Sequence, residues 1–235
     1  MKINEFGCPF CNEFNGKKHL SYFEKNIGTM RGIHERCILE TKNFVCVPSI
    51  GSFVEGYLLI IPKKHFLSFL SIPFNYTNEL FSIFDCLNDY YLNFYNSKFI
   101  VFEHGSSNQD NTGGMSVFHA HLHVVPYDLS FFSIVRDYQF MKFNSFLAVK
   151  NAYCSRTEQN PYLFFKDTNG DYYYSENKNI PSQFFRKRMC NSLGLTNMGD
   201  WKEYPFIENI EKTISSANNY QLQIKYNENT GGKYG

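Results

Sequence analysis

The chain has 235 residues, a formal net charge of +1 and a hydrophobic content of 43%. This length can bury an extensive core, either as one large domain or as a core with a substantial extension. Because the net charge is close to zero, the sequence carries no electrostatic footprint for nucleic acid or for an anionic membrane, and we expect neither as a partner.

The N-terminal stretch MKINEFGC lacks the apolar segment of a signal peptide, and the apolar run LLIIP at 58–62 is far too short to span a bilayer. The seven cysteines are an odd number, and only Cys8 and Cys11 are closely spaced. We therefore expect reduced thiols and a cytoplasmic location. In that compartment, the stretch CPFC indicates either half of a metal site or a redox pair.

The first half of the chain alternates short strand and helix signals. Residues 44–62 predict two short strands separated by turn residues. Residues 77–95 carry apolar side chains at three- and four-residue steps, which predicts an amphipathic helix. We expect a strand at 98–104, a polar loop with glycines at its ends at 105–114, and another strand at 115–125.

The character of the sequence changes after Pro126. Residues 161–175 predict a hairpin with a two-residue Asn-Gly turn. Residues 181–195 predict a helix with Ser182 as its N-cap. We place a boundary near residue 130.

The stretch FHAHLHVVP at 118–126 has histidines at three alternate positions, His119, His121 and His123. On a strand they share one face, and the apolar residues between them enter a core. Neighbouring histidines would then lie roughly 6.6 Å apart and the outer pair about 13 Å apart. One metal ion binds two neighbours easily but not all three, which favours a division between metal and substrate. The alternative is an exposed polar strand face.

The two cysteines of CPFC have the spacing of a metal-binding knuckle. A structural zinc ion prefers four thiolate and imidazole ligands, so Cys8 and Cys11 would need two histidines to complete the site. A redox pair and two inert thiols are the alternatives.

The histidine stretch resembles a known signature. HAHLHVVP fits in full the pattern of the histidine triad (HIT) superfamily, in which a histidine–apolar pair is repeated three times and followed by two apolar residues. GGMSV at 113–117 is similar to the family's glycine–glutamine–serine–valine, with Met115 where glutamine is common. GYLLIIPKKH at 56–65 resembles its glycine–histidine–apolar–proline–lysine–histidine segment, with Tyr57 where histidine is common. CPFC stands where zinc-containing members carry their N-terminal pair.

The resemblance covers roughly residues 6–128 and implies an α+β fold, a HIT-like antiparallel sheet with a packed helix, followed by a C-terminal α/β extension. We divide the chain into a nucleotide-binding catalytic core at 1–130 and an extension at 131–235, a hairpin plus a helix, that could pack on the core. Family members usually pair through the sheet, so a homodimer is possible, although the extension could cover that surface instead.

Part of the extension looks like the tails that follow the core in some larger bacterial members and in a splicing-associated branch. Its Arg186, Lys187 and Arg188 could reach a polyphosphate. We prefer the interpretation that they form a solvated basic face on a helix that buries Phe185 and Met189.

The resemblance also implies roles for single residues. A structural zinc ion would be held by Cys8, Cys11, His65 and His119. His121 would attack the α-phosphorus of a nucleotide, and His123 would donate to a nonbridging oxygen. Ser116, with the amides after Gly113 and Gly114, would act near the leaving group. Expected substrate contacts are Asn108, Gly114 and Met115.

Two departures from the family pattern concern substrate contacts. Ser49 stands where an acidic residue often binds the ribose. The asparagine that contacts phosphate would fall at Asn108, or at Glu103 if the loop carries an insertion.

The expected function is that of a zinc-stabilised nucleotide hydrolase or nucleotidyl transferase, acting on a small nucleotide through a nucleotidyl-histidine intermediate. One alternative is a metallohydrolase in which zinc bound to the triad activates water. Another is a non-catalytic nucleotide-binding module, in which the substitutions at Tyr57, Met115 and Ser49 mark lost turnover.

Overall fold

The computed structural model describes residues 7–106, 117–176 and 179–222. Its centre is an eight-stranded antiparallel sheet with the order β1-β2-β3-β5-β4-β7-β8-β6. The strands are β1 (Leu39–Glu40), β2 (Phe44–Pro48), β3 (Leu58–Pro62), β4 (Phe99–Gly105), β5 (Leu122–Pro126), β6 (Met141–Phe143), β7 (Tyr162–Lys166) and β8 (Tyr172–Glu176).

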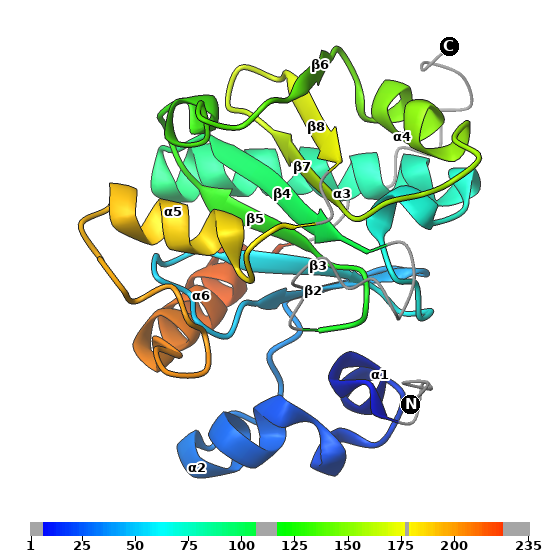
Figure 1. Ribbon diagram of the computed structural model, residues 1–235. Helices are drawn as coiled ribbons and strands as arrows, with labels where there is room; N and C mark the ends of the chain where they lie inside the picture. Colours follow the sequence, from blue (N-terminus) through cyan, green and yellow to red (C-terminus); the bar gives the residue numbers. More distant parts are fainter. Residues whose placement is uncertain (1–6, 107–116, 177–178, 223–235) are drawn as a thin grey trace.

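Helices cover the sheet on both faces. The α-helices are α1 (Pro9–Phe14), α2 (Thr29–Arg31), α3 (Thr77–Tyr90), α4 (Phe146–Cys154), α5 (Phe184–Ser192) and α6 (Ile207–Tyr220). Short 3-10 and π-helical turns are η2 (Lys18–Leu20), η3 (Glu24–Gly28), η4 (Phe69–Ser71), η5 (Phe74–Tyr76), η6 (Tyr91–Tyr95) and η7 (Phe131–Ile134). In the view of Figure 1, α3 runs behind the sheet and α5 lies in front of it. Among the helices of the described residues, none combines the length and apolar composition that a membrane span requires.

Alternate residues of each strand supply two separate cores. Leu122 and Val124 of β5 pack on the side of α3, together with Leu80 and Leu87 of that helix. Val125 faces the opposite core, which includes residues of α1 and α5. Because side chains alternate along a strand, His123 also faces the α1 and α5 side of the sheet.

Most elements expected in the first half of the chain are confirmed. The helix expected at 77–95 is α3, continued by one π-helical turn, and it ends at Asn96, which has a φ of 49°. The strands expected at 44–62 and 98–104 are β2, β3 and β4.

The histidine strand is shorter than expected. Only the last triad residue, His123, lies within β5, which begins at Leu122. The amide of Ala120 donates instead to the carbonyl of Phe66, 2.7 Å away. Residue 120 therefore lies outside the sheet, which the chain joins at Leu122.

The elements expected in the C-terminal half are present with different ends. The hairpin is β7 and β8, but its turn is longer than two residues, because the Asp167 amide still bonds to the Asp171 carbonyl at 2.9 Å. The helix expected at 181–195 is α5, and its N-cap is Gln183 rather than Ser182.

The extension continues the sheet of the preceding part. Strand β4 pairs with β5 on one side and with β7 on the other, in a register that sets Val101 opposite Lys166 and Gly105 opposite Tyr162. A residue larger than glycine at position 105 would meet the Tyr162 ring at 2.1 Å. The expected division near residue 130 stays a prediction.

We expect the truncated chain 1–130 to aggregate. The truncation would free the edge of β4 and uncover apolar residues, such as Phe102, that contact Phe131 and Phe185. Expression of residues 1–130, followed by sedimentation of the soluble fraction, tests this expectation. A soluble, folded fragment with the turnover of the full chain would contradict it.

Glu103 of β4 is a carboxyl group inside the core. It accepts a 2.7 Å hydrogen bond from the Phe69 amide and another from the Tyr162 hydroxyl. Burial raises the pKa of Glu103 to about 8, against these two hydrogen bonds and the charge of Lys150, which lower it.

Glu103 should make the protein less stable as the pH rises. Because its folded-state pKa lies above the unfolded one, its contribution is fully present below about pH 4.5 and is lost towards pH 8. Glu103→Gln should therefore flatten the decline of the free energy of unfolding between pH 5 and pH 8. Urea titrations at four pH values measure the free energy of unfolding, and Glu203→Gln, at an exposed position, is the matched control. If the free energy of unfolding declined equally steeply with pH in wild type and Glu103→Gln, the raised pKa of Glu103 would be refuted.

Candidate functional site

Four potential metal ligands meet at the end of β3. Cys8 is the N-cap of α1 and Cys11 lies within that helix, which Pro9 begins. The Sγ atom of Cys8 lies 3.3 Å from Nδ1 of His119, and Sγ of Cys11 lies 3.4 Å from Nδ1 of His65. The ligand atoms of these four residues all lie within 4.8 Å of one another.

The donor set fits a tetrahedral zinc ion. Zn–S and Zn–N bonds of about 2.0–2.3 Å place neighbouring ligand atoms about 3.5 Å apart, close to the observed separations. Nε2 of His119 lies 2.7 Å from the carbonyl of Pro62, which can only accept, so Nε2 carries the proton and Nδ1 keeps its lone pair for a metal. The pKa of the Cys8 thiol is lowered to about 2, first by its hydrogen bond with Cys11, while burial opposes the shift.

The second triad histidine points into a pocket beside this cluster. Nδ1 of His121 lies 2.7 Å from the carbonyl oxygen of His119 and must donate to it, which leaves Nε2 with its lone pair. Burial lowers the pKa of His121 to about 4, although the bond to His119 raises it. His121 is therefore a neutral imidazole at neutral pH, and the ring of Phe10 packs edge-on against it with centroids 5.5 Å apart.

The third triad histidine can adopt the opposite tautomer. Nδ1 of His123 lies 2.7 Å from the hydroxyl of Tyr57, and that hydroxyl accepts from Nη1 of Arg186 at 3.1 Å. Burial raises the pKa of Tyr57 to about 12, so its hydroxyl keeps its proton and can donate it to Nδ1 of His123. Burial also holds the pKa of His123 well below its usual value. Neutral His123 then carries its proton on Nε2 and can act as a donor there.

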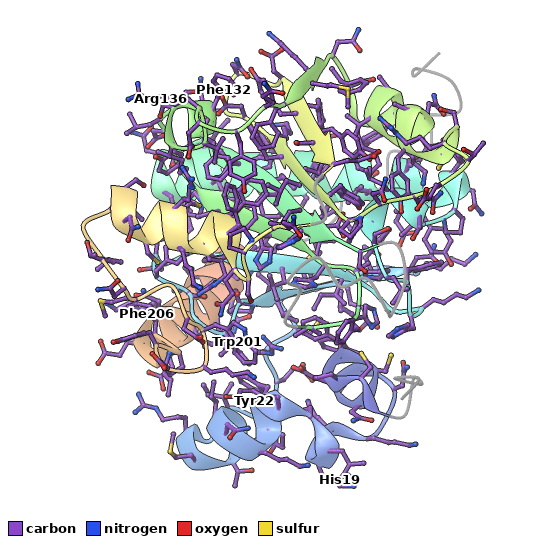
Figure 2. All side chains as sticks on the ribbon, viewed as in Figure 1. His19, Tyr22, Phe132, Arg136, Trp201 and Phe206 are labelled. Carbon is purple, nitrogen blue, oxygen red and sulfur yellow. The ribbon has the colours of Figure 1, made fainter. Side chains whose placement is uncertain are left out.

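Residues from both ends of the chain line the pocket that contains His121 and His123. Tyr22 and Trp201 pack edge to face at its rim with centroids 4.9 Å apart, and Figure 2 labels both where the N-terminal and C-terminal segments meet. The lining residues are Pro9, Phe10, Glu13, Tyr22, Phe23, Arg36, Ser49, Ile50, Leu59, Phe102, His104, Val117, His121, His123, Gln183, Phe184, Phe185, Arg186 and Trp201.

A glycine lets the C-terminal segment approach the pocket. Gly51 has a φ of +79°, and a Cβ built there would lie 2.4 Å from Nη2 of Arg186 and 2.6 Å from Cβ of Trp201. Its carbonyl accepts from that Nη2 at 2.7 Å. A larger residue at position 51 would therefore separate Arg186 from the pocket wall.

Several expected residues lie elsewhere or cannot be compared. The structure does not describe five of the expected residues, which are Asn108, Gly113, Gly114, Met115 and Ser116. Ser49 lines the pocket, and its hydroxyl donates to the carbonyl of Ile50 at 3.1 Å.

Glu103 faces the α3 side of the sheet, away from the pocket, so it is unsuitable as a phosphate contact. Its neighbour His104 lines the pocket instead, and sequence reasoning missed it. The signal was the strand period, because His104 lies on the same face of β4 as Phe102, the residue opposite His123.

The solvated basic face expected at 186–188 is wrong for its first residue. Arg186 is only 5% exposed and lines the pocket, whereas Lys187 is exposed and Arg188 pairs with Asp137 at 2.5 Å. Helical spacing could have indicated this, since Arg186 stands three positions before the buried Met189.

Known proteins resemble the part of the chain that carries these histidines. The family model of the HIT domain matches residues 31–129. No curated protein is similar enough to this chain to count as a relative.

Among solved structures, a hypothetical histidine triad nucleotide-binding protein from Sulfolobus tokodaii is 20% identical, with a TM-score of 0.37, over 52% of this chain and 69% of that one. A zinc-bound histidine triad family protein from Mycobacterium smegmatis is 21% identical, with a TM-score of 0.37, over 52% of this chain and 76% of that one. A histidine triad protein from Clostridium difficile is 19% identical, with a TM-score of 0.39, over 54% of this chain and 96% of that one.

The matched segment includes His65, the helix α3 and all three triad histidines. The three histidines of the triad therefore lie in the segment that matches the HIT domain.

Proposed function

We propose that the protein is a nucleotide hydrolase or nucleotidyl transferase whose His121 attacks the α-phosphorus of a small nucleotide. HIT membership supports nucleotide binding and this class of chemistry. The observation that carries the proposal is the tautomer of His121, whose bond to the His119 carbonyl leaves a neutral Nε2 with a lone pair in the pocket.

The proposed reaction has two steps. Nε2 of His121 forms a bond to phosphorus as the bond to the leaving group breaks, and water or another acceptor then displaces His121. Nε2–H of His123 donates to a nonbridging oxygen, where negative charge increases in the transition state. By resemblance, Ser116 acts near the leaving group, and the expected substrate contacts are Asn108, Gly114 and Met115.

We propose a structural role for a zinc ion held by Cys8, Cys11, His65 and His119. Four protein ligands would complete its coordination and leave no position for an activated water, which speaks against the metallohydrolase. The ion would tie α1 to the end of β3 and fix His119, whose carbonyl orients His121. Retention of His121 and a donor at His123 likewise speak against a binding module without turnover.

We further propose a cytoplasmic location and a small-molecule substrate, with no nucleic-acid partner. The homodimer that the resemblance implies stays a prediction. Pairing of β4 with β7 supports the alternative that the extension occupies the sheet edge.

Loss of a cysteine ligand should remove zinc and destabilise the fold. Because metal binding is coupled to folding, we expect Cys8→Ser to lower the zinc content and to reduce Tm by roughly 10 °C. Metal analysis and thermal unfolding measure both, and Cys154→Ser is the matched control, since Cys154 is exposed and outside the cluster. Full zinc occupancy in a Cys8→Ser, Cys11→Ser double variant would rule out this ligand set.

Replacing the nucleophile should abolish turnover without affecting the metal. We expect His121→Ala to lose about three to six orders of magnitude in turnover while it keeps its zinc content and Tm, and His123→Ala to lose about two to three orders of magnitude in turnover. Suitable substrates are a panel of dinucleoside polyphosphates, nucleoside phosphoramidates and nucleotide sugars, with products identified by mass spectrometry. The exposed His19→Ala is the control.

The covalent intermediate can be trapped separately. Wild type mixed briefly with a substrate labelled at the α-phosphate and quenched in alkali should carry acid-labile label on the peptide with His121. Label on another residue, or an active His121→Ala protein, would overturn the mechanism.

A further inference from the structure

Arg186 is the only residue of the C-terminal segment that brings a positive charge to the described wall of the catalytic pocket. Its guanidinium makes three hydrogen bonds, from Nη2 to the Gly51 carbonyl at 2.7 Å, from Nη1 to the Tyr57 hydroxyl at 3.1 Å and from Nε to the Gly199 carbonyl at 3.3 Å. These bonds hold the side chain in one position beside the triad.

None of these three acceptors carries a charge. The rings of Phe53 and Tyr57 lie 5.4 Å from the guanidinium carbon and add only cation–π contacts. Within the described ranges, no carboxylate forms an ion pair with Arg186. A buried charge without an opposite charge is strongly unfavourable, so Arg186 is poised for an anion.

The other charged residues of the pocket wall neutralise each other. Nε of Arg36 lies 2.6 Å from Oε1 of Glu13, and both side chains are almost completely buried. Among the described lining residues, Arg186 is therefore the one Lys or Arg side chain whose charge no carboxylate of the wall balances.

The guanidinium also has donors left for a ligand. Arginine has five N–H groups, of which the three hydrogen bonds use one each on Nε, Nη1 and Nη2. One N–H on each terminal nitrogen is therefore not used by these three bonds and can donate to a phosphate oxygen.

We propose that Arg186 is a substrate-binding residue, which binds a phosphate group of the substrate and makes the pocket select for phosphorylated ligands. Through the Tyr57 hydroxyl, Arg186 and His123 are neighbours, so the bound phosphate lies next to the reacting group. This inference rests on the proposed nucleotide chemistry, and it assigns the anion site to the C-terminal extension.

The test compares ligands that differ only in a phosphate. Binding of each common nucleoside and its 5′-monophosphate is measured by calorimetry in wild type, Arg186→Gln, Arg186→Lys and Arg188→Gln. We expect Arg186→Gln to weaken monophosphate binding about ten- to a hundredfold and to leave nucleoside binding unchanged, because charged hydrogen bonds contribute at this level. Arg188→Gln, on the same helix but paired with Asp137, should behave as wild type.

Arg186→Lys is the control for a folding defect. It keeps the positive charge and should retain most of the preference for monophosphates over nucleosides. Equal losses for nucleoside and monophosphate in Arg186→Gln would make the residue structural and overturn the proposal, as would unchanged monophosphate binding. Absence of monophosphate binding in wild type would overturn it as well. Failure of the catalytic proposal is distinguishable, because it appears as missing turnover or missing label on His121 while the binding preference persists.

Discussion

The site depends on one residue that acts through both its side chain and its main chain. The ring of His119 bonds to Pro62 through Nε2 and turns Nδ1 towards Cys8, while its carbonyl accepts from Nδ1 of His121. The metal cluster and the pocket are therefore not independent, since any movement of His119 in the cluster also moves the acceptor that fixes the tautomer of His121. A structural metal in this position would act on the chemistry by holding a carbonyl in place, without touching the substrate.

Burial on both faces of the sheet supplies the second requirement of the site. The α3 side is closed by an apolar core, and the opposite side is closed by α1, α5 and aromatic rings. Phe102 stacks on His123 with ring centroids 4.6 Å apart, and Phe10 packs against His121. Burial in this surrounding keeps both imidazoles neutral, which suits one to act as a nucleophile and the other as a donor.

Sequence alone predicted the features that depend on local spacing. The period of α3, the knuckle of Cys8 and Cys11 and the Pro-Lys-His stretch all occur within short windows, and the cluster that they form with His119 matches the expected set. Features that depend on distant contacts could not be read in this way. The expected in-register row of histidines is wrong because Ala120 bonds to Phe66 outside the sheet, and the burial of Arg186 requires Gly51, 135 positions away.

The C-terminal segment is attached at several places to the segment that matches the HIT domain. Strand β7 continues the sheet beyond β4, Arg186 bonds to Gly51 and Tyr57, and Thr213 of α6 accepts a 2.8 Å hydrogen bond from the amide of Gly56. Gly51, Gly56 and Tyr57 all belong to the connection between β2 and β3 or adjoin it. Because that connection carries Tyr57, the partner of His123, the extension supports the wall of the pocket as well as the edge of the sheet. The extension supplies Arg186, and the hydroxyl of Tyr57 can accept from Arg186 and donate to His123 at the same time. This double role accounts for tyrosine at position 57, where the family commonly has histidine.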